Sequence, residues 1–435
     1  MVKKFMEISR VTTASALAAA LIFGGTSLPH SSNIVEAQTV TTSSAVSAQA
    51  VDDYHIVAVG DSLTVGYING MEKEANPVPY GYVERVYEQA LFHGLRASVS
   101  HYGILGLTTE GLQHYIEAAE KGEAVKAVDL PFGTSKDPRI DQLAAATPQL
   151  FADLEAADLV TITTGSNDFL TVFDKLKDGT GAAAVAEMLP IFEQQLEASL
   201  RAVIGINPKA EIVVSDLYNP APHNKLLISE EAYQALAQAS QDVRSRIENV
   251  AKKLTDEGFN VRVAHVGDPF LGHELEYTTV AKGDFHPNAK GYTSMGKSFS
   301  QAIWGDYREV APRAADVPIS VVVAGKELQT ANKPVLKNNK TYVPMRDITD
   351  AMGALLKWDG KTQTATVTFG DRVVAITIGA KTMVINGTTV ALDTPAYLQK
   401  VGKETKTYLP LAALSDGLGF QVIYRGTLKT AFINK

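Results

Sequence analysis

Short apolar runs alternate with longer amphipathic stretches over roughly the first two thirds of the chain. Four runs have the length and the β-branched content of buried strands: residues 55–59, 159–163, 211–215 and 260–264. Between them, residues 192–204 place apolar side chains at helical spacing, and Ser229 has the character of an N-cap for a helix that extends to about residue 254. Strands that alternate with helices predict a parallel sheet covered on both faces, which is a three-layer α/β/α fold.

The pattern changes in the last third of the chain, which is rich in Val, Thr and Ile and contains hairpin signals. Residues 341–345 (TYVPM) are similar to residues 407–411 (TYLPL), and two later pairs of matching segments keep the same offset of 66 residues, the difference between 341 and 407. Each copy predicts a short helix that ends at a glycine and is followed by a hairpin, and the Asn386-Gly387 pair is typical of a tight turn. We therefore predict a smaller α+β domain built from two copies of one unit.

Shifts in composition divide the chain into five segments. The first carries Lys3, Lys4 and Arg10 before an Ala-rich apolar run, which is typical of a secretory signal peptide cleaved after Ala37. A membrane anchor retained in the mature protein is the alternative, but the run is short for a bilayer span and is broken by glycine and proline. The predicted segments are a signal peptide (1–37), a Ser/Thr/Ala-rich linker (38–51), a first domain (52–310), a second linker (311–317) and a second domain (318–435). We therefore expect a secreted, extracellular protein.

The composition narrows the chemistry that the protein can perform. The 435 residues carry a net charge of −8 without a strongly basic stretch, which argues against nucleic-acid binding because little would neutralise the phosphates. The chain has no cysteine, which excludes disulfides, zinc–thiolate sites, iron–sulfur clusters and a thiol nucleophile. Any catalysis therefore has to use oxygen, nitrogen and backbone groups.

Polar residues cluster where the first two predicted strands end, and ligand sites of parallel sheets lie at the carboxyl ends of the strands. Ser62 lies just after a strand that ends at Gly60, so its hydroxyl can be presented at the sheet edge, and His286 is a candidate base. The Asn167 amide and the backbone N–H of Gly106 are candidate donors to an oxyanion. Taken singly, each of these residues is better explained as an ordinary cap, turn or surface residue, so the assignment depends on the whole set.

In this order, the residues closely resemble the four sequence blocks of the GDSL, or SGNH, hydrolase family over about residues 52–305. The matching segments are 60–63 (GDSL), Gly106, 165–168 (GSND) and 286–288 (HPN). The resemblance implies an SGNH-hydrolase-like three-layer fold and the hydrolysis of carboxylic esters through an acyl-serine intermediate, without a metal or a cofactor. It also implies the individual roles: a nucleophile, Ser62; a general base, His286; and an oxyanion hole formed by the backbone N–H groups of Ser62 and Gly106 with the Asn167 amide.

One position departs from the family pattern. The family usually places an acid three residues before the histidine, where this chain has Gly283, and Asp284 lies one residue closer to His286. We expect Asp284 to orient His286 as the third member of a triad. A Ser–His dyad supported by a backbone carbonyl is the alternative.

Two other groups of polar residues receive no catalytic role from the sequence. The spacing argues against a metal site formed by His265, Asp268, His273 and Glu274, which we interpret as solvated loop residues. Residues 129–143 are predicted to form a polar loop, which either borders the acyl pocket or is an insertion without a role.

The second domain also carries a resemblance. Residues 340–346 (KTYVPMR), with Trp358 and Asp359, are similar to the copper amine oxidase N-terminal domain, a stalk domain of many secreted bacterial proteins. No histidine follows His286 and the chain has no cysteine, so we expect this domain to bind no copper. We expect it to act as a spacer or to associate the protein with the cell envelope.

Together these observations indicate a secreted serine esterase or lipase-type acylhydrolase, a carboxylic ester hydrolase acting on a small-molecule or lipid ester. Apolar residues near the predicted site favour short to medium acyl chains: Leu63, Ile104, Leu105, Leu107 and Phe169. One alternative is an O-acetylesterase whose substrate is an acylated cell-wall or other polysaccharide. The other is a non-catalytic surface protein on a decayed hydrolase fold.

Overall fold

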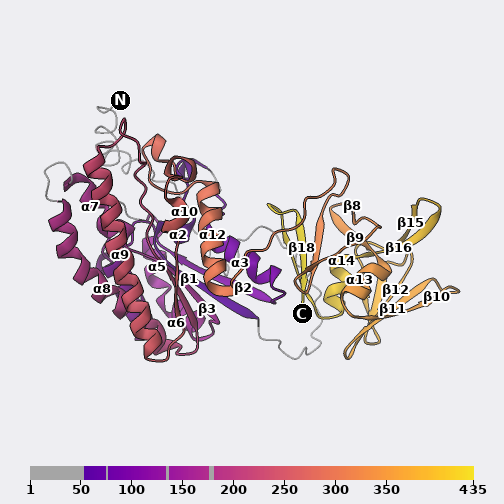
Figure 1. Cartoon of the computed structure of the whole chain (residues 1–435). Helices are drawn as coiled ribbons and strands as arrows, with labels where there is room; N and C mark the ends of the chain where they lie inside the picture. The colour runs from indigo at the N-terminus through magenta and orange to yellow at the C-terminus, as the bar shows by residue number, and fades with distance from the viewer. Residues whose placement is uncertain (1–52, 75–76, 134–136, 176–180) are drawn as a thin grey trace. The chain divides into compact units, whose positions relative to one another are not determined.

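The computed structural model describes residues 53–74, 77–133, 137–175 and 181–435 (Figure 1). The predicted signal peptide and the first linker lie outside these residues. The described chain forms two compact units. The first holds Tyr54–Tyr87 and Ser98–Tyr307, and the second holds Arg308–Lys435 together with Glu88–Ala97. Within the described residues, no helix combines the length and the hydropathy needed to cross a membrane.

A five-stranded sheet forms the centre of the first unit, with its strands in the order β2-β1-β3-β4-β5. The strands are β1 (Tyr54–Gly60), β2 (Ala97–Gly103), β3 (Leu159–Thr163), β4 (Glu211–Ser215) and β5 (Val261–Ala264). The pairings of β1 with β3, β3 with β4 and β4 with β5 are parallel. Four of these strands were predicted from their apolar runs. The edge strand β2 was missed because its sequence, ASVSHYG, is polar and half-buried in the middle.

Helices cover both faces of this sheet, which confirms the predicted three-layer α/β/α fold (Figure 1). One face presents side chains such as Val57, Val160 and Ile212 to an apolar core shared with α4, α6, α8 and α9. On the other face, Tyr82 of α3 stacks on Phe299 of α12, and its hydroxyl reaches Thr161 of β3. The long helices are α3 (Tyr82–Phe92), α4 (Thr109–Glu120), α6 (Thr147–Glu155), α7 (Ser166–Lys175), α8 (Gly181–Ile206), α9 (Glu230–Asp256) and α12 (Ala289–Trp304).

Short elements connect the strands to these helices. They are α2 (Ser62–Val65), η2 (Met71–Lys73), η3 (Ala127–Asp129), α5 (Ile140–Ala145), α10 (Gly267–Phe270), α11 (Glu274–Tyr277) and η4 (Val280–Lys282). The predicted N-cap is confirmed, since the Ser229 hydroxyl accepts a hydrogen bond from the Ala232 N–H at the start of α9. Because β1 and β3 run parallel, α2 and α7 begin at the same edge of the sheet. Candidate residues from both turns are therefore brought to one edge.

The second unit consists of three antiparallel or mixed sheets and two short helices. The sheets hold β6 (Ser320–Val323), β7 (Lys326–Glu327), β17 (Gln421–Arg425) and β18 (Thr430–Asn434); β8 (Val335–Lys337), β9 (Lys340–Pro344), β15 (Tyr397–Val401) and β16 (Glu404–Pro410); and a meander of β10 (Leu355–Asp359), β11 (Thr364–Phe369), β12 (Arg372–Thr377), β13 (Thr382–Ile385) and β14 (Thr388–Ala391). The helices are α13 (Met345–Ala351) and α14 (Leu411–Gly417).

The predicted two-copy repeat is visible in this unit. Helices α13 and α14 start 66 residues apart, at Met345 and Leu411, and each follows a proline that ends a strand. These two strands, β9 and β16, pair with each other in antiparallel register, so that Leu409 lies opposite Val343. Asn386 and Gly387 both have positive φ, 48° and 84°, which gives the tight turn between β13 and β14 that the sequence indicated.

Candidate active site

Ser62 is held at a sharp turn between β1 and α2. Gly60 ends the strand with φ 147°, and a Cβ atom there would lie 2.2 Å from the Thr163 carbonyl oxygen, so only glycine fits. Asp61 is the N-cap of α2, and its Oδ1 accepts hydrogen bonds from the Leu63 N–H (3.0 Å) and the Thr163 hydroxyl (2.8 Å). Ser62 is therefore the first helical residue, with an N–H that the helix itself leaves without an acceptor.

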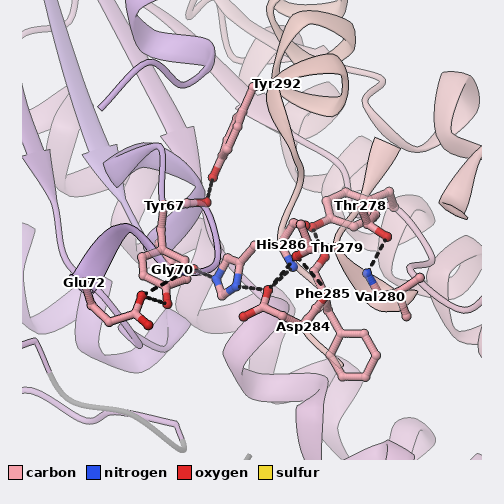
Figure 2. Close-up of polar contacts among 12 residues, drawn as sticks. Tyr67, Gly70, Glu72, Thr278, Thr279, Val280, Asp284, Phe285, His286 and Tyr292 are labelled. Atoms are coloured by element: carbon pink, nitrogen blue, oxygen red, sulfur yellow. Dashed lines mark hydrogen bonds and ion pairs between the residues drawn. The ribbon is translucent and has the colours of Figure 1, made fainter. Parts of the chain in front are cut away.

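Three of the predicted site residues form one hydrogen-bonded series. Ser62 Oγ lies 2.8 Å from His286 Nε2. His286 Nδ1 lies 2.8 Å from Asp284 Oδ1, as Figure 2 shows. The same carboxylate oxygen accepts a hydrogen bond from the His286 backbone N–H at 2.8 Å. The ring of His286 is thus fixed on one side by Asp284 and faces Ser62 on the other, the geometry expected of a nucleophile, its base and an orienting acid.

The shifted position of Asp284 is explained by the local backbone. Gly283 ends η4 in the left-handed region, with φ 86°, and turns the chain so that Asp284 lies beside the ring two residues later. Burial opposes ionisation of this carboxyl, but hydrogen bonds from the His286 ring and backbone and the charge of the ring lower the pKa of Asp284 to about 2. Asp284 is therefore a carboxylate over the whole neutral range.

The predicted oxyanion donors lie in two segments that contact each other. Gly106 has φ 78° and lies in the loop after β2, where the Ile104 N–H donates to the Gly60 carbonyl at 2.9 Å. This bond holds the loop beside the nucleophile turn. Asn167, in the first turn of α7, donates from Nδ2 to the Leu107 carbonyl at 2.9 Å, which sets the orientation of its amide. Among the described residues, the Gly106 N–H donates to no backbone carbonyl.

Sequence reasoning missed Tyr67, whose ring packs edge-on against His286. The ring centroids are 4.7 Å apart at an angle of 65°. The Tyr67 hydroxyl donates to Glu72 Oε2 at 2.8 Å, and the Tyr292 hydroxyl donates to the Tyr67 carbonyl at 2.7 Å (Figure 2). Burial raises the pKa of Tyr67, with Glu72 adding to the shift. No motif in the sequence marks Tyr67.

Asp168 is a second residue whose role the sequence left open. Its carboxylate accepts hydrogen bonds from the Thr109 N–H, at 3.0 Å from Oδ2, and from the Thr109 hydroxyl, at 3.1 Å. These bonds tie the start of α7, next to Asn167, to the start of α4. Burial raises the pKa of Asp168 to about 6, against the hydrogen bonds from Thr109 that favour its charged form.

The residues set aside as metal-ligand candidates pair with separate partners. His265 Nδ1 lies 3.2 Å from Asp216, Asp268 pairs with Arg244, and His273 Nδ1 lies 3.2 Å from Glu276. The interpretation as a solvated residue is wrong for Glu274, which is only 3% exposed and whose carboxylate accepts a hydrogen bond from the Gly272 N–H. Over the ranges that the structure describes, no three His, Asp or Glu side chains come together as metal ligands.

A mainly apolar cavity of about 90 Å³ is lined in part by residues adjacent in sequence to Asn167, Asp284 and His286. Its lining includes Ser166, which precedes Asn167, and Phe285, which lies between Asp284 and His286. The remaining lining residues are Phe169, Leu170, Leu217, Tyr218, Asn219, Pro220, Leu236, Ala239, Ser240 and Val243. Of the five apolar residues expected near the site, only Phe169 lines this cavity. Leu63, Ile104 and Leu107 are instead buried in the protein interior.

Two known families match this chain. Residues 58–293 match the family described as GDSL-like Lipase/Acylhydrolase, and residues 322–433 match the one described as Copper amine oxidase N-terminal domain. Both resemblances noted in the sequence are thereby confirmed. The uncharacterized protein YpmR of Bacillus subtilis (strain 168) is 22% identical over 250 residues, which make up 57% of this chain and 80% of that protein.

Solved structures of several esterases are also similar to this chain. The lipase Lip_vut3 from a goat rumen metagenome is 18% identical with a TM-score of 0.38, and the match covers 56% of this chain and 95% of that one. Axe2, an acetylxylan esterase from Geobacillus stearothermophilus, is 18% identical with a TM-score of 0.36 and coverages of 60% and 97%. A Clostridium thermocellum family 3 carbohydrate esterase is 15% identical with a TM-score of 0.35 and coverages of 57% and 94%.

Proposed function

The chain belongs to the GDSL-like lipase/acylhydrolase family, and we propose that it hydrolyses carboxylic esters of short acyl chains with Ser62 as the nucleophile. The observation that carries the proposal is the series from Ser62 Oγ through His286 to Asp284, with 2.8 Å at each of its two steps. A serine hydroxyl paired with an imidazole whose other nitrogen faces a carboxylate is an arrangement suited to nucleophilic catalysis.

In the acylation half of the reaction, His286 Nε2 accepts the proton of the Ser62 hydroxyl as Oγ attacks the carbonyl carbon of the ester. The tetrahedral intermediate carries a negative oxygen, which accepts hydrogen bonds from the N–H groups of Ser62 and Gly106 and from the Asn167 amide. Loss of one such donor typically raises the barrier by about 2.7–4 kcal/mol. The intermediate then collapses, and His286 donates its proton to the leaving alcohol.

The deacylation half repeats these steps with water. His286 Nε2 accepts a proton from a water molecule, whose oxygen attacks the acyl-serine carbonyl, and the same donors stabilise the second oxyanion. Collapse releases the carboxylic acid and returns the proton to Ser62 Oγ. Asp284 stays ionised at neutral pH and stabilises the imidazolium formed in each half.

The size of the apolar cavity supports the preference for short acyl chains. At about 90 Å³ it is smaller than the roughly 150 Å³ cavity that holds a benzene ring in an engineered protein. Aromatic and aliphatic side chains, among them Phe169, Leu236 and Phe285, favour a hydrocarbon group over a sugar. We propose that the cavity receives the acyl part of the substrate and leaves the alcohol part outside.

We also propose that the protein is exported and held at the cell envelope. The charged and apolar pattern of residues 1–37 supports export, and the domain that matches at residues 322–433 supports a stalk or envelope-binding role. Fractionation of the producing cells, with detection of the chain in medium, envelope and cytoplasm, tests this part. Recovery from the cytoplasm alone, with residues 1–37 still present, would contradict it.

The esterase proposal is tested with p-nitrophenyl esters of acyl chains from about two to twelve carbons, and with acetylated xylan as a polysaccharide substrate. We expect turnover by the wild type with an optimum at short acyl chains and a loss of about 10⁴-fold or more in Ser62→Ala. Ser245→Ala is the matched control, because Ser245 is exposed on α9 and its hydroxyl donates to the Gln241 carbonyl.

The outcomes of this assay distinguish the alternatives. Faster hydrolysis of acetylated polysaccharide than of the small esters would show that the protein is an O-acetylesterase. Ser62-dependent turnover that is fastest on long acyl chains contradicts the short-chain preference. Absence of Ser62-dependent turnover on every ester overturns the enzymatic proposal and favours a non-catalytic surface protein.

A further inference from the structure

Residues 131–133 and 137–139, two parts of the polar loop to which the sequence assigned no role, lie against the loop that carries Gly106. The contacts come from two described pieces, residues 131–133 and residues 137–139, and each contacts a different side of the Gly106 loop. The sequence left open whether this segment borders the acyl pocket or is an insertion without a role. None of its described residues, 131–133 and 137–139, lines the apolar cavity, so their contacts require another explanation.

The first contact is made by Asp137, whose side chain is completely buried. Asp137 Oδ2 accepts a hydrogen bond from the Leu105 N–H at 2.9 Å, one residue before Gly106. Arg139 donates to the same carboxylate from Nη2 (2.7 Å), Nε (3.0 Å) and its backbone N–H (2.8 Å). A buried carboxylate is stable only when it is paired and hydrogen-bonded, and here both oxygens have partners.

The ion pair of Asp137 and Arg139 can lie beside the oxyanion that develops during the reaction without repelling it. Asp137 alone would repel an oxyanion at the Gly106 N–H, but the Arg139 guanidinium neutralises it through two parallel hydrogen bonds. The pair can therefore hold the Leu105 amide rigidly with no net charge. A neutral amide in place of Asp137 cannot accept the same hydrogen bonds. Its NH₂ group, which is a donor, would face either the Leu105 N–H or the guanidinium, which are also donors.

The second contact is made by the backbone of residues 131–133. The Gly133 N–H donates to the Gly106 carbonyl at 2.9 Å, and Phe132 forms an isolated antiparallel bridge with Leu107. The Pro131 carbonyl accepts a hydrogen bond from the Thr108 hydroxyl at 3.1 Å. The peptide groups on both sides of the Gly106 N–H are thus fixed by residues of this segment, while that N–H has no backbone acceptor among the described residues.

Gly133 also lies against the third oxyanion donor. A Cβ atom at residue 133 would be 3.1 Å from Asn167 Cβ and 3.2 Å from the Asn167 carbonyl oxygen. An alanine here would make tighter than usual contacts with Asn167 and would have to displace it by a few tenths of an ångström, so Gly133 lets the segment pack closely against Asn167. Asn167 in turn donates to the Leu107 carbonyl, so the two donors and the segment form one packed group.

We propose that Asp137 and Gly133 are positioning residues that fix the oxyanion hole, with Asp137 acting through the Leu105 amide and Gly133 through the Gly106 carbonyl and Asn167. The inference rests on the proposed esterase function, because it concerns the transition state of that reaction. Residues 131–133 and 137–139 of the polar loop then hold the active site in place and are not an insertion without a role. Neither residue touches the reacting atoms.

The test compares the full-length wild type with Asp137→Asn and Gly133→Ala, using a p-nitrophenyl ester that the wild type hydrolyses. We expect kcat to fall by about 10- to 100-fold in each variant with KM within about twofold, because displaced donors weaken only the transition state. Inhibition by an alkyl boronic acid, whose tetrahedral serine adduct places an oxygen in the oxyanion hole, should weaken by a similar factor. Partial unfolding alone would lower the active fraction without changing the inhibition constant.

Asp141→Asn is the matched control, because it removes the same charge from an exposed residue of α5. Gly133→Ala keeps the proposal testable if Asp137→Asn does not fold, since the two changes act on opposite sides of the Gly106 loop. Wild-type turnover that depends on Ser62, with kcat and boronic-acid affinity in the variants within about twofold of wild type, overturns this inference and leaves the esterase function standing. A wild type without Ser62-dependent turnover overturns both.

Discussion

Ser62 Oγ lies 2.8 Å from His286 Nε2 although 224 residues separate them in the chain. Each comes to this point for its own reason: Ser62 because Gly60 and Asp61 make a sharp strand-to-helix turn, and His286 because Asp284 holds its ring and backbone. The contact therefore depends on two short segments, each held by its own local hydrogen bonds.

Replacement of Asp284 by Asn should lower kcat by more than tenfold and up to about 10⁴-fold, because the amide cannot stabilise the imidazolium and can hold the wrong tautomer of His286. The measurement is kcat on a short-chain p-nitrophenyl ester. Asp256→Asn, at an exposed position of α9, serves as the control. A loss smaller than tenfold would show that His286 works as a dyad with Ser62.

Replacement of Gly60 by Ala should abolish Ser62-dependent turnover and destabilise the protein, because the new Cβ would lie 2.2 Å from the Thr163 carbonyl oxygen. Gly258→Ala is the matched control, since Gly258 also has positive φ, 98°, but has no atom within 4 Å of the new Cβ. The control carries only the backbone strain of about 1–2 kcal/mol. Urea unfolding and kcat measure the two effects, and equal stabilities of the two variants would contradict the prediction.

The stability difference between the wild type and Asp168→Asn should depend on pH. Burial raises the pKa of Asp168 from 3.8 to about 6, so between these values the folded protein keeps a proton that the unfolded chain has released. The free energy of unfolding of the wild type, relative to the variant, should therefore fall by about 2–3 kcal/mol from about pH 4 to about pH 7. Urea unfolding of both proteins across this range measures the slope. A difference that is flat or rises with pH would mean that Asp168 is charged in the folded protein at low pH.

Replacement of Ala239 by Leu should shift the substrate preference toward acetyl esters, because Ala239 lines the apolar cavity and the larger side chain would occupy part of its volume of about 90 Å³. We expect kcat/KM to fall by about tenfold or more for a hexanoyl ester, the equivalent of losing contacts with one to two methylenes, and to change little for an acetyl ester. Ala235→Leu on the same helix, outside the cavity lining, is the control. Equal losses of kcat/KM on the hexanoyl and acetyl esters would show that the acyl chain does not bind in the cavity.

Several features followed from the sequence because they depend on neighbours along the chain. The β-branched runs that became β1, β3, β4 and β5 are continuous, and Gly60, two residues before Ser62, supplies the positive φ of the local turn, 147°. The 66-residue repeat was also readable, since each copy has its own strand, proline and helix. The edge strand β2 was not readable, because its polar side chains carry no core-facing pattern.

Other features were decided only by the tertiary structure, because they join segments that are distant in the chain. The sequence offered Asp284 and a backbone carbonyl as alternatives, and the turn at Gly283 brought the carboxylate to the His286 ring. The Tyr67 ring contacts the His286 ring, and Asp137 accepts a hydrogen bond from the Leu105 N–H. No sequence motif predicted either contact. Strands and local turns depend mainly on residues that are close in the sequence. A hydrogen bond between distant segments depends instead on the path of the whole backbone between its partners. The sequence alone therefore determined four strands of the first unit, the repeat and the nucleophile turn, and the fold determined which groups surround that turn.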